Sequence, residues 1–393
     1  MRTIGIVSVG RSDYGIYTPL LRKIQADEDL NLHLIVAGMH LSPEFGYTVQ
    51  YIEADGFEIG EKVEMLVSSN TPQGVAKSLG LGIIGFSQAL EHVRPDILIV
   101  LGDRFEMYSA ALAALPYKIP VAHIHGGEVT HGAIDDALRH SITKLSHLHF
   151  VSTDIYKVRV EQLGEEPWRI AISGAPALGH LRTMELLSKE KLESCFEIPL
   201  DIPPLLVTFH PVTLEFEKTE WQVDELLAAL DMISFPIVFT MPNADTGHNL
   251  IHQKIKEFAN GHSSTWLFDN LGTQNYFSLM KYAAAMVGNS SSGIIEAPSF
   301  ELPVVNIGTR QSGRMRAANV IDTGYMRDEI LGAIQKAVSF EFRQTLEGLQ
   351  NPYGDGFAAE KIVQKLKTVV LDDKLLTKRF WDVEFTPYCE EIK

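Results

Sequence analysis

Short apolar runs, rich in β-branched residues, recur along the first part of the chain, and stretches of helical periodicity separate them. Continuous apolar runs that alternate with helices are typical of parallel strands covered on both faces, because neither face of such a strand meets water. The pattern therefore predicts a doubly wound α/β domain. The strands that we expect in it are 4–9, 32–37, 97–101, 121–124, 148–151 and 170–172.

A second series of the same kind follows a polar, proline-containing stretch at 180–204, which we interpret as a linker. Apolar residues spaced by three and four predict a closing helix over 357–369. The expected organisation is a Rossmann-like domain over 1–185, a second one over 186–357, and a closing helix and tail over 358–393. The strands expected in the second domain are 205–209, 237–241, 266–268, 285–287 and 304–307.

Composition and charge narrow the classes of ligand. The chain has 393 residues, 45% of them hydrophobic, and a formal net charge of −16, which fits a soluble globular protein. A polyanion repels nucleic acid and anionic lipid, so we expect neither as a partner. The two cysteines form no CxxC pair, and no apolar segment approaches a signal peptide or a membrane span, so we expect a cytoplasmic protein. An anionic small molecule fits only where basic side chains gather locally.

In open α/β sheets ligands bind beyond the carboxyl ends of the strands, so we expect the site in a cleft where two such edges face each other. The segment 288–293, Gly-Asn-Ser-Ser-Ser-Gly, follows one predicted strand and precedes a helix. Free N–H groups and the hydroxyls of Ser290 and Ser291 predict a diphosphate cradle there, with an ordinary serine N-cap as the alternative. Glu296 can accept hydrogen bonds from a ribose or be a solvated helix carboxylate. Arg310, one of three arginines over 308–316, favours a local anion site.

Other strand-end loops carry further ligand candidates. The loop after the first strand lacks the GxGxxG fingerprint, which disfavours a nicotinamide cofactor. In that loop Arg11 is a natural phosphate clamp, and Gly15 closes the segment. His210 can neutralise phosphate oxygens or a departing diphosphate, or be a satisfied structural histidine. Asn243 and Asp245 are candidates for sugar or base contacts, although Asx-rich turns use such residues locally.

Acid and base candidates gather in the first half. Asp103 follows the strand 97–101, where it can act as base or acid or can cap the next helix. In His123-Ile-His-Gly-Gly-Glu128 the two histidines face one side if both lie on a strand, and two glycines leave Glu128 free to reach a reacting atom. A metal site is disfavoured, because a catalytic metal usually needs a third ligand held at a defined strand end, and the second half offers only His210 and His248 in nearby loops. Asp135 and Asp136 fall in the first turn of the next helix.

These segments together resemble the hydrolysing UDP-N-acetylglucosamine 2-epimerases of bacterial sialic-acid or legionaminic-acid biosynthesis, in order from residue 1 to about 370. Seven ordered motifs are more specific than any single one. The segments that carry the resemblance are 10–15, 102–106, 123–128, 139–147, 209–211, 288–293 and 306–310.

The resemblance implies a GT-B-like architecture of two Rossmann-like domains, with the nucleotide sugar in the cleft between them. It implies that UDP-N-acetylglucosamine and water give N-acetylmannosamine and UDP, the first step of sialic-acid synthesis, with no metal or nicotinamide. In the family's scheme the C2 proton is removed, UDP leaves anti to give a 2-acetamidoglucal, and water then adds. Relatives are dimers or tetramers, so the resemblance also implies a homodimer or homotetramer.

Carried over by motif position, the resemblance implies a catalytic role for Asp103 and Asp135. It leaves the choice of Asp135 or Asp136 open. Several relatives have a catalytic glutamate where this chain has His125, so either His125 or Glu128 takes the second acid/base role. The residues that it implies for UDP binding are Arg11, Asn243, Ser290, Ser291, Glu296 and Arg310.

Alternative functions remain at this point. One is the same reaction on UDP-N,N'-diacetylbacillosamine, which differs by an acetamido group at C4 and a missing hydroxyl. A GT-B glycosyltransferase would share the nucleotide site but not the chemistry at C2. A metal-dependent hydrolase built on the histidines is the third.

Overall fold

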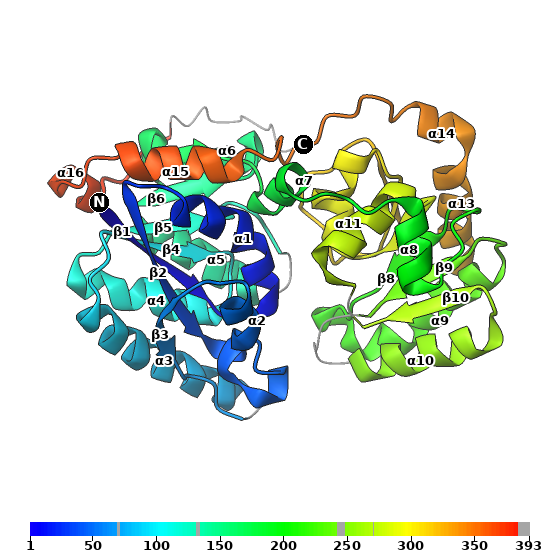
Figure 1. Cartoon of the computed structure of the whole chain (residues 1–393), viewed down its shortest axis with the longest axis horizontal. Helices are drawn as coiled ribbons and strands as arrows, with labels where there is room; N and C mark the ends of the chain where they lie inside the picture. Colours follow the sequence, from blue (N-terminus) through cyan, green and yellow to red (C-terminus); the bar gives the residue numbers. More distant parts are fainter. Residues whose placement is uncertain (69–70, 131–133, 242–247, 270, 384–393) are drawn as a thin grey trace, which may run out of the picture. The chain divides into compact units, whose positions relative to one another are not determined.

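Two parallel β-sheets, one early in the chain and one late, organise the molecule (Figure 1). The computed structural model describes residues 1–68, 71–130, 134–241, 248–269 and 271–383. The chain forms two units, and we describe each by itself. The first unit comprises Met1–Glu128, Ile134–Gly179 and Gly354–Lys393, and the second comprises Val129–Ala133 and His180–Tyr353.

The sheet of the first unit has seven parallel strands in the order β3-β2-β1-β4-β5-β6-β7. The strand order reverses between β1 and β4, which makes this pair the topological switch point where α/β sheets bind ligands. The strands are β1 (Arg2–Ser8), β2 (Leu30–Ala37), β3 (Ile59–Val63), β4 (Ile97–Leu101), β5 (Val121–Ile124), β6 (Leu148–Val151) and β7 (Ile170–Ile172).

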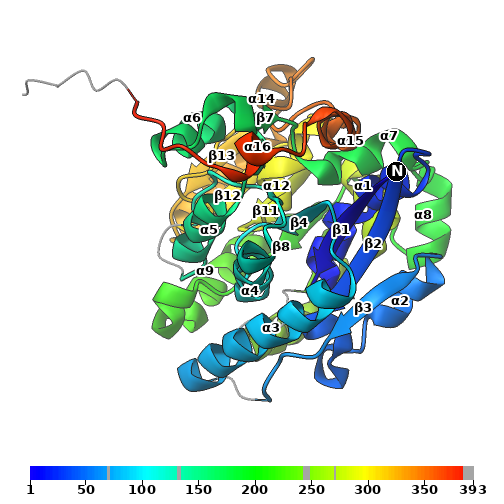
Figure 2. The same cartoon turned by 90° about the vertical axis from the view of Figure 1, so that its left-hand side faces the viewer.

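Helices cover both faces of this sheet, as right-handed crossovers to either side of the switch point require. Figures 1 and 2 show α3 and α4 packed together on one face, while α1 and α15 pack together on the other. Helix α15 therefore returns the end of the chain to the first unit. The helices of this unit are α1 (Arg11–Gln25), α2 (Val49–Ala54), α3 (Pro72–His92), α4 (Phe105–Ala114), α5 (Ile134–Leu145), α6 (Asp154–Gln162), α15 (Ala358–Thr368) and α16 (Asp373–Leu376).

The sheet of the second unit has six parallel strands in the order β10-β9-β8-β11-β12-β13, with its switch point between β8 and β11. Its strands are β8 (Leu205–Thr208), β9 (Ile237–Thr240), β10 (Thr265–Phe268), β11 (Ala285–Gly288), β12 (Val304–Ile307) and β13 (Val320–Thr323). Its helices are α7 (His180–Thr183), α8 (Lys189–Phe196), α9 (Thr219–Asp231), α10 (His248–Gly261), α11 (Gly272–Tyr282), α12 (Ser292–Ile295), α13 (Arg327–Val338) and α14 (Phe340–Gln344).

Strand β8 shows why continuous apolar runs form these sheets. Leu205 and Val207 are buried in a core with side chains of α9, α10 and α13, whereas Leu206 is buried in a second core with side chains of α8 and α11. Successive side chains of a strand point to opposite faces, so a strand with a core on each side is apolar at every position.

The predicted fold class of two doubly wound α/β domains is confirmed, as are the eleven predicted strands and the closing helix, with ends within two residues of those expected. The prediction missed β3 and β13. Both are edge strands whose residues alternate or remain partly exposed, so neither carries a continuous apolar run. Within the described ranges, every helix is too short or too polar to cross a lipid bilayer.

Candidate functional site

Asp103 lies directly beyond the carboxyl end of β4. Gly102, with a φ of 74°, turns the chain out of the strand, and the side chain of Asp103 is 23% exposed. Arg104 occupies the N-cap position of α4, so Asp103 does not cap that helix. The Asp103 carboxylate instead forms an ion pair with the guanidinium of Arg139. Asp103 therefore meets solvent and a buried cation at the same strand end.

Arg139 is the centre of the ionisable cluster in the first unit. It lies on α5 and is only 3% exposed. Its Nη1 donates to the carbonyl of His125 at 3.1 Å and lies 4.0 Å from Glu128 Oε2, while Nη2 contacts Asp103. No role for Arg139 was predicted from the sequence. The available signal was its place four residues after Asp135, which puts both residues on one face of a helix.

The two aspartates at the start of α5 have different surroundings. Burial, and next the negative charge of Asp103, raise the pKa of Asp135. The Asp136 carboxylate instead lies 3.4 Å from His140 Nε2, one turn along the same helix. Of the two aspartates, Asp135 is therefore the one whose pKa is raised by the charge of Asp103.

His125 and Glu128 form a buried pair just beyond β5. The strand ends at Ile124, and His125 has a φ of 65°, so His125 lies beyond the strand and the condition for the two histidines to face one side is not met. Its Nδ1 lies 2.6 Å from Glu128 Oε1 and 3.0 Å from Ser152 Oγ. Glu128 is 2% exposed, so the prediction that two glycines leave it free to move is wrong.

His123 is a satisfied core histidine. Its Nε2 lies 2.7 Å from the carbonyl oxygen of Gly102, and its Nδ1 lies 3.1 Å from Thr143 Oγ1. Burial lowers the pKa of His123 to about 3, so the ring is neutral at physiological pH. In the part of the chain that the structure describes, no three His, Cys, Asp or Glu side chains are grouped so that they could hold a metal ion.

The segment after β1 forms the start of α1. Arg11 is the first residue of this helix and is exposed, and Gly15 lies within it with open space where a side chain would project. Asp13 was not predicted from the sequence. Its Oδ2 accepts from the N–H of Val9 at 2.7 Å and from Ser8 Oγ at 3.2 Å. Burial raises the pKa of Asp13 to about 6. Asp13 thus fixes the turn that presents Arg11.

In the second unit, His210 and Asn289 follow the two strands of the switch point, β8 and β11, and hydrogen bonds join them. His210 is buried, and its Nδ1 has no hydrogen-bond partner among the described residues. Burial, and next the positive charge of Arg310, lower the pKa of His210 to about 3. The ring is therefore neutral in this structure, which differs from one of the two roles left open by the sequence, that of a cation neutralising phosphate oxygens.

Gly288 brings the ends of β8 and β11 together. Its φ is 135°, and a Cβ at this position would lie 1.9 Å from the carbonyl oxygen of Thr208, so only glycine fits. The serines that follow are half-buried and lead into the single turn of α12. Ser291 occupies the N-cap position and its side chain caps no N–H group, but Ser290 Oγ accepts from the N–H of Ser292 at 3.4 Å, so a local capping role for the serines stays open beside the diphosphate cradle.

Glu296 and Arg310 complete the described group. Glu296 is 9% exposed, and burial raises its pKa to about 7. The guanidinium of Arg310 donates to the backbone carbonyl of Asn289 at 3.1 Å. Burial raises the pKa of Tyr276, which was not predicted from the sequence, while interactions with the side chains of Ser292, Thr208 and Ser290 oppose that rise. The serines, the carboxyl and the arginine thus surround the end of β11, while Asn243 and Asp245 lie outside the described residues.

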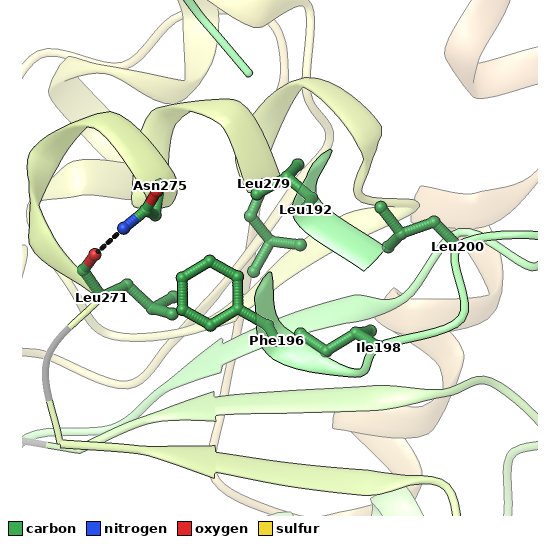
Figure 3. A pocket seen from close by; sticks show the side chains of 7 residues that line it. All are labelled: Leu192, Phe196, Ile198, Leu200, Leu271, Asn275 and Leu279. Carbon is green, nitrogen blue, oxygen red and sulfur yellow. Dashed lines mark hydrogen bonds between the residues drawn. The ribbon is translucent and has the colours of Figure 1, made fainter. Parts of the chain in front are cut away.

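An apolar crevice between α8 and α11 lies apart from these groups. Its only polar lining side chain is that of Asn275, whose Nδ2 donates to the carbonyl of Leu271 at 2.6 Å. The crevice offers no charged group to a nucleotide, so we do not assign the site there. Figure 3 shows its lining residues, which are Leu192, Phe196, Ile198, Leu200, Leu271, Asn275 and Leu279.

Comparison with known proteins gives a consistent result. A family model described as UDP-N-acetylglucosamine 2-epimerase matches residues 22–367. A Campylobacter jejuni protein named GDP/UDP-N,N'-diacetylbacillosamine 2-epimerase (hydrolyzing) is 44% identical over 97% of this chain and 99% of its own length. A Legionella pneumophila protein named UDP-N,N'-diacetylbacillosamine 2-epimerase (hydrolyzing) is 36% identical over 96% of this chain and 99% of its own.

The fold has a well-defined counterpart among solved structures. The crystal structure of UDP-GlcNAc 2-epimerase from Neisseria meningitidis bound to UDP-GlcNAc superposes with a TM-score of 0.82 and is 19% identical. The match covers 94% of this chain and 100% of the Neisseria chain. The GT-B-like fold class is thereby confirmed.

Proposed function

The chain belongs to the UDP-N-acetylglucosamine 2-epimerase family, and from that premise we propose that it is a hydrolysing 2-epimerase whose substrate is UDP-N,N'-diacetylbacillosamine. The observation that carries the choice of substrate is the sugar, N,N'-diacetylbacillosamine, that appears in the names of both the Campylobacter and the Legionella relative, which match this chain at nearly full length. UDP-N-acetylglucosamine, the first expectation from the sequence, becomes the alternative. N-acetylmannosamine and the sialic-acid step are part of that alternative only.

The proposed reaction consumes one water. A base removes the proton at C2, the C1–O bond to UDP breaks, and a C1=C2 glycal forms. Water then adds its oxygen to C1, while C2 receives a proton on the face opposite the one that lost it. The products are UDP and 2,4-diacetamido-2,4,6-trideoxymannose. Such a sequence needs a base at C2, a second proton donor and groups that hold the departing diphosphate.

The cluster around Arg139 supports the proton-transfer roles. We assign Asp103 as the base at C2, because it is the partly exposed carboxylate at the end of β4. We assign Asp135 as the proton donor, because its raised pKa favours the protonated form that a donor needs. Its electrostatic interaction with Asp103 supports Asp135 over Asp136. The hydrogen-bonded pair of His125 and Glu128 is the candidate for the remaining acid/base function.

The group around β11 in the second unit supports UDP binding. We propose that Ser290, Ser291 and Arg310 contact the diphosphate, because hydroxyls and a guanidinium are suited to phosphate oxygens. Glu296 would accept hydrogen bonds from the ribose. Before the substrate binds, His210 is neutral and can donate a hydrogen bond to a phosphate oxygen. The negative charge of the bound diphosphate would then raise the pKa of the ring and favour its protonation.

The remaining ligand candidates, Arg11, Gly15, Asn243 and Asp245, keep their proposed contacts with the nucleotide sugar. The proposal also includes a cytoplasmic location and, from the resemblance, assembly as a homodimer or homotetramer.

The test is to incubate the protein in heavy water with UDP-N,N'-diacetylbacillosamine and, separately, with UDP-N-acetylglucosamine. With the first substrate we expect UDP to be released and deuterium to appear at C2 of the free sugar. UDP release is measured by ³¹P NMR, and deuterium at C2 is measured by the loss of the C2 proton signal in ¹H NMR. Consumption of UDP-N-acetylglucosamine alone would return the assignment to the alternative. Release of UDP without deuterium at C2 would contradict 2-epimerisation with either substrate.

A further inference from the structure

His125 holds a backbone conformation that is rare for residues other than glycine. Its φ of 65° lies in the left-handed region. The N–H of His125 donates to the carbonyl of Phe150 at 3.0 Å, and its own carbonyl accepts from Arg139 at 3.1 Å. Strained backbone persists where the surroundings fix it, and it clusters at functional sites. The fold therefore holds the His125 ring in one direction beyond the end of β5.

The contacts of the ring assign its proton. Nδ1 of His125 lies 2.6 Å from Glu128 Oε1 and 3.0 Å from Ser152 Oγ. An ionised carboxylate only accepts hydrogen bonds, so Nδ1 carries the proton and donates it to Glu128. The Ser152 hydroxyl, 3.4 Å from the same oxygen, is then a second donor to the carboxylate. In the neutral ring the lone pair is consequently on Nε2.

Glu128 is poorly placed to exchange protons with a substrate itself. Both residues are buried, with His125 7% and Glu128 2% exposed, but Oε1 of Glu128 faces the His125 ring and Ser152, and Oε2 lies 4.0 Å from the guanidinium of Arg139. Both hydrogen bonds of the His125 ring among the described residues involve Nδ1, which leaves Nε2 available. This is the arrangement in which a carboxylate orients an imidazole and fixes its tautomer while the far nitrogen accepts a proton.

We propose that Nε2 of His125 is the general base that takes a proton from the water attacking C1 of the glycal, with Glu128 and Ser152 as positioning residues. The inference rests on the proposed function and concerns only its hydration step. The water oxygen bonds to C1, the C1=C2 electron pair takes a proton at C2 from Asp135, and Nε2 receives the proton that water gives up. Exchange with solvent then restores Asp135 and His125.

His125→Gly gives a sharp first test, because glycine accepts the left-handed backbone and the variant loses only the ring. We expect UDP release to continue and hydration to fall by about 10²-fold or more, so that the glycal accumulates. The ratio of glycal to free sugar, read by NMR against UDP released, is the measurement. His125→Asn is the matched control, since asparagine also tolerates this backbone but has no imidazole.

Added imidazole separates a base from a structural role. We expect it to restore hydration in the glycine variant, whose cavity can admit the ring, and not in the asparagine variant. Glu128→Gln should lower hydration by about tenfold or more, because a carboxamide N–H donates to Nδ1 and moves the ring proton to Nε2. Ser152→Ala keeps the Glu128 carboxylate, so we expect it to lower the rate of hydration by less than Glu128→Gln does.

Three results would overturn the assignment. The first is hydration at the wild-type rate in His125→Gly. The second is a loss of both UDP release and hydration in His125→Gly that added imidazole does not reverse. The third is unchanged hydration in Glu128→Gln. The unaltered protein is the control for the proposed function. If it releases no UDP from either nucleotide sugar, the proposed function fails, whereas a failure confined to the variants removes only the role of His125.

Discussion

His210 and Asn289 exchange two hydrogen bonds across the switch point of the second sheet. The N–H of His210 donates to Asn289 Oδ1 at 2.7 Å, and Asn289 Nδ2 donates to the carbonyl of His210 at 2.8 Å. Asn289 is fully buried, and its own carbonyl accepts from Arg310. One side chain therefore sets the spacing between the end of β8 and the loop that we assign to the diphosphate.

Asn289→Ala should lower both stability and UDP affinity. The substitution leaves the buried N–H and carbonyl of His210 without partners, which costs about 1–3 kcal/mol. We expect a corresponding fall in the free energy of unfolding by urea denaturation and about tenfold weaker UDP binding by calorimetry. Gln253→Ala, an exposed change in the same unit, is the control. Unchanged UDP affinity in a destabilised Asn289→Ala would show that the pair supports only the fold.

Asp103→Asn should abolish exchange at C2 while UDP still binds. The amide has nearly the same shape but cannot take a proton, so we expect turnover to fall by about 10²–10⁴-fold. Deuterium incorporation at C2 and calorimetry with UDP are the two measurements. Asp154→Asn, an exposed carboxylate of the same unit, should leave both unchanged. Near-normal turnover in Asp103→Asn would remove Asp103 from the base role.

The sheets could be predicted from the sequence because most strands are buried on both faces. Ile97–Leu101 is apolar throughout and was predicted to the residue, whereas the edge strand Ile59–Val63 alternates with exposed positions and was missed. The expectation that strand-end loops hold the site singled out Asp103 and His210, which the structure places just beyond the ends of β4 and β8. Ligands of open α/β sheets bind beyond the carboxyl ends of the strands, and these ends can be located from the sequence without knowing which side chains touch.

The partners of these residues could not be predicted in the same way. Arg139 reaches Asp103 across 36 positions of the chain, and Ser152 meets His125 only because β5 and β6 are neighbours. The left-handed backbone of His125 also has no sequence signal, because residues other than glycine are uncommon in that region. Such contacts depend on how α5 and the strand ends pack, which spacing along the chain does not encode.

Asp135 and Asp136 offer a matched pair of substitutions. Burial and the nearby charge of Asp103 raise the pKa of Asp135, whereas Asp136 pairs with His140 at 3.4 Å. We expect Asp135→Asn to lower turnover by about 10²-fold or more, and Asp136→Asn to change it by only a few-fold. Steady-state rates of UDP release measure both. The reverse order of effects would reassign the proton donor to Asp136.

Glu296→Gln should change how stability depends on pH. Burial raises the pKa of Glu296 from 4.5 to about 7, so the folded chain binds this proton more tightly than the unfolded chain does. The contribution of the carboxyl to stability is therefore complete below pH 4.5 and is lost as pH rises through 7. Relative to Glu296→Gln, which does not titrate, the wild type should lose about 3 kcal/mol of unfolding free energy over this range. Urea denaturation at several pH values measures the difference. The exposed Glu341→Gln should follow the wild type, and parallel curves for wild type and Glu296→Gln would show that folding does not raise the pKa of Glu296.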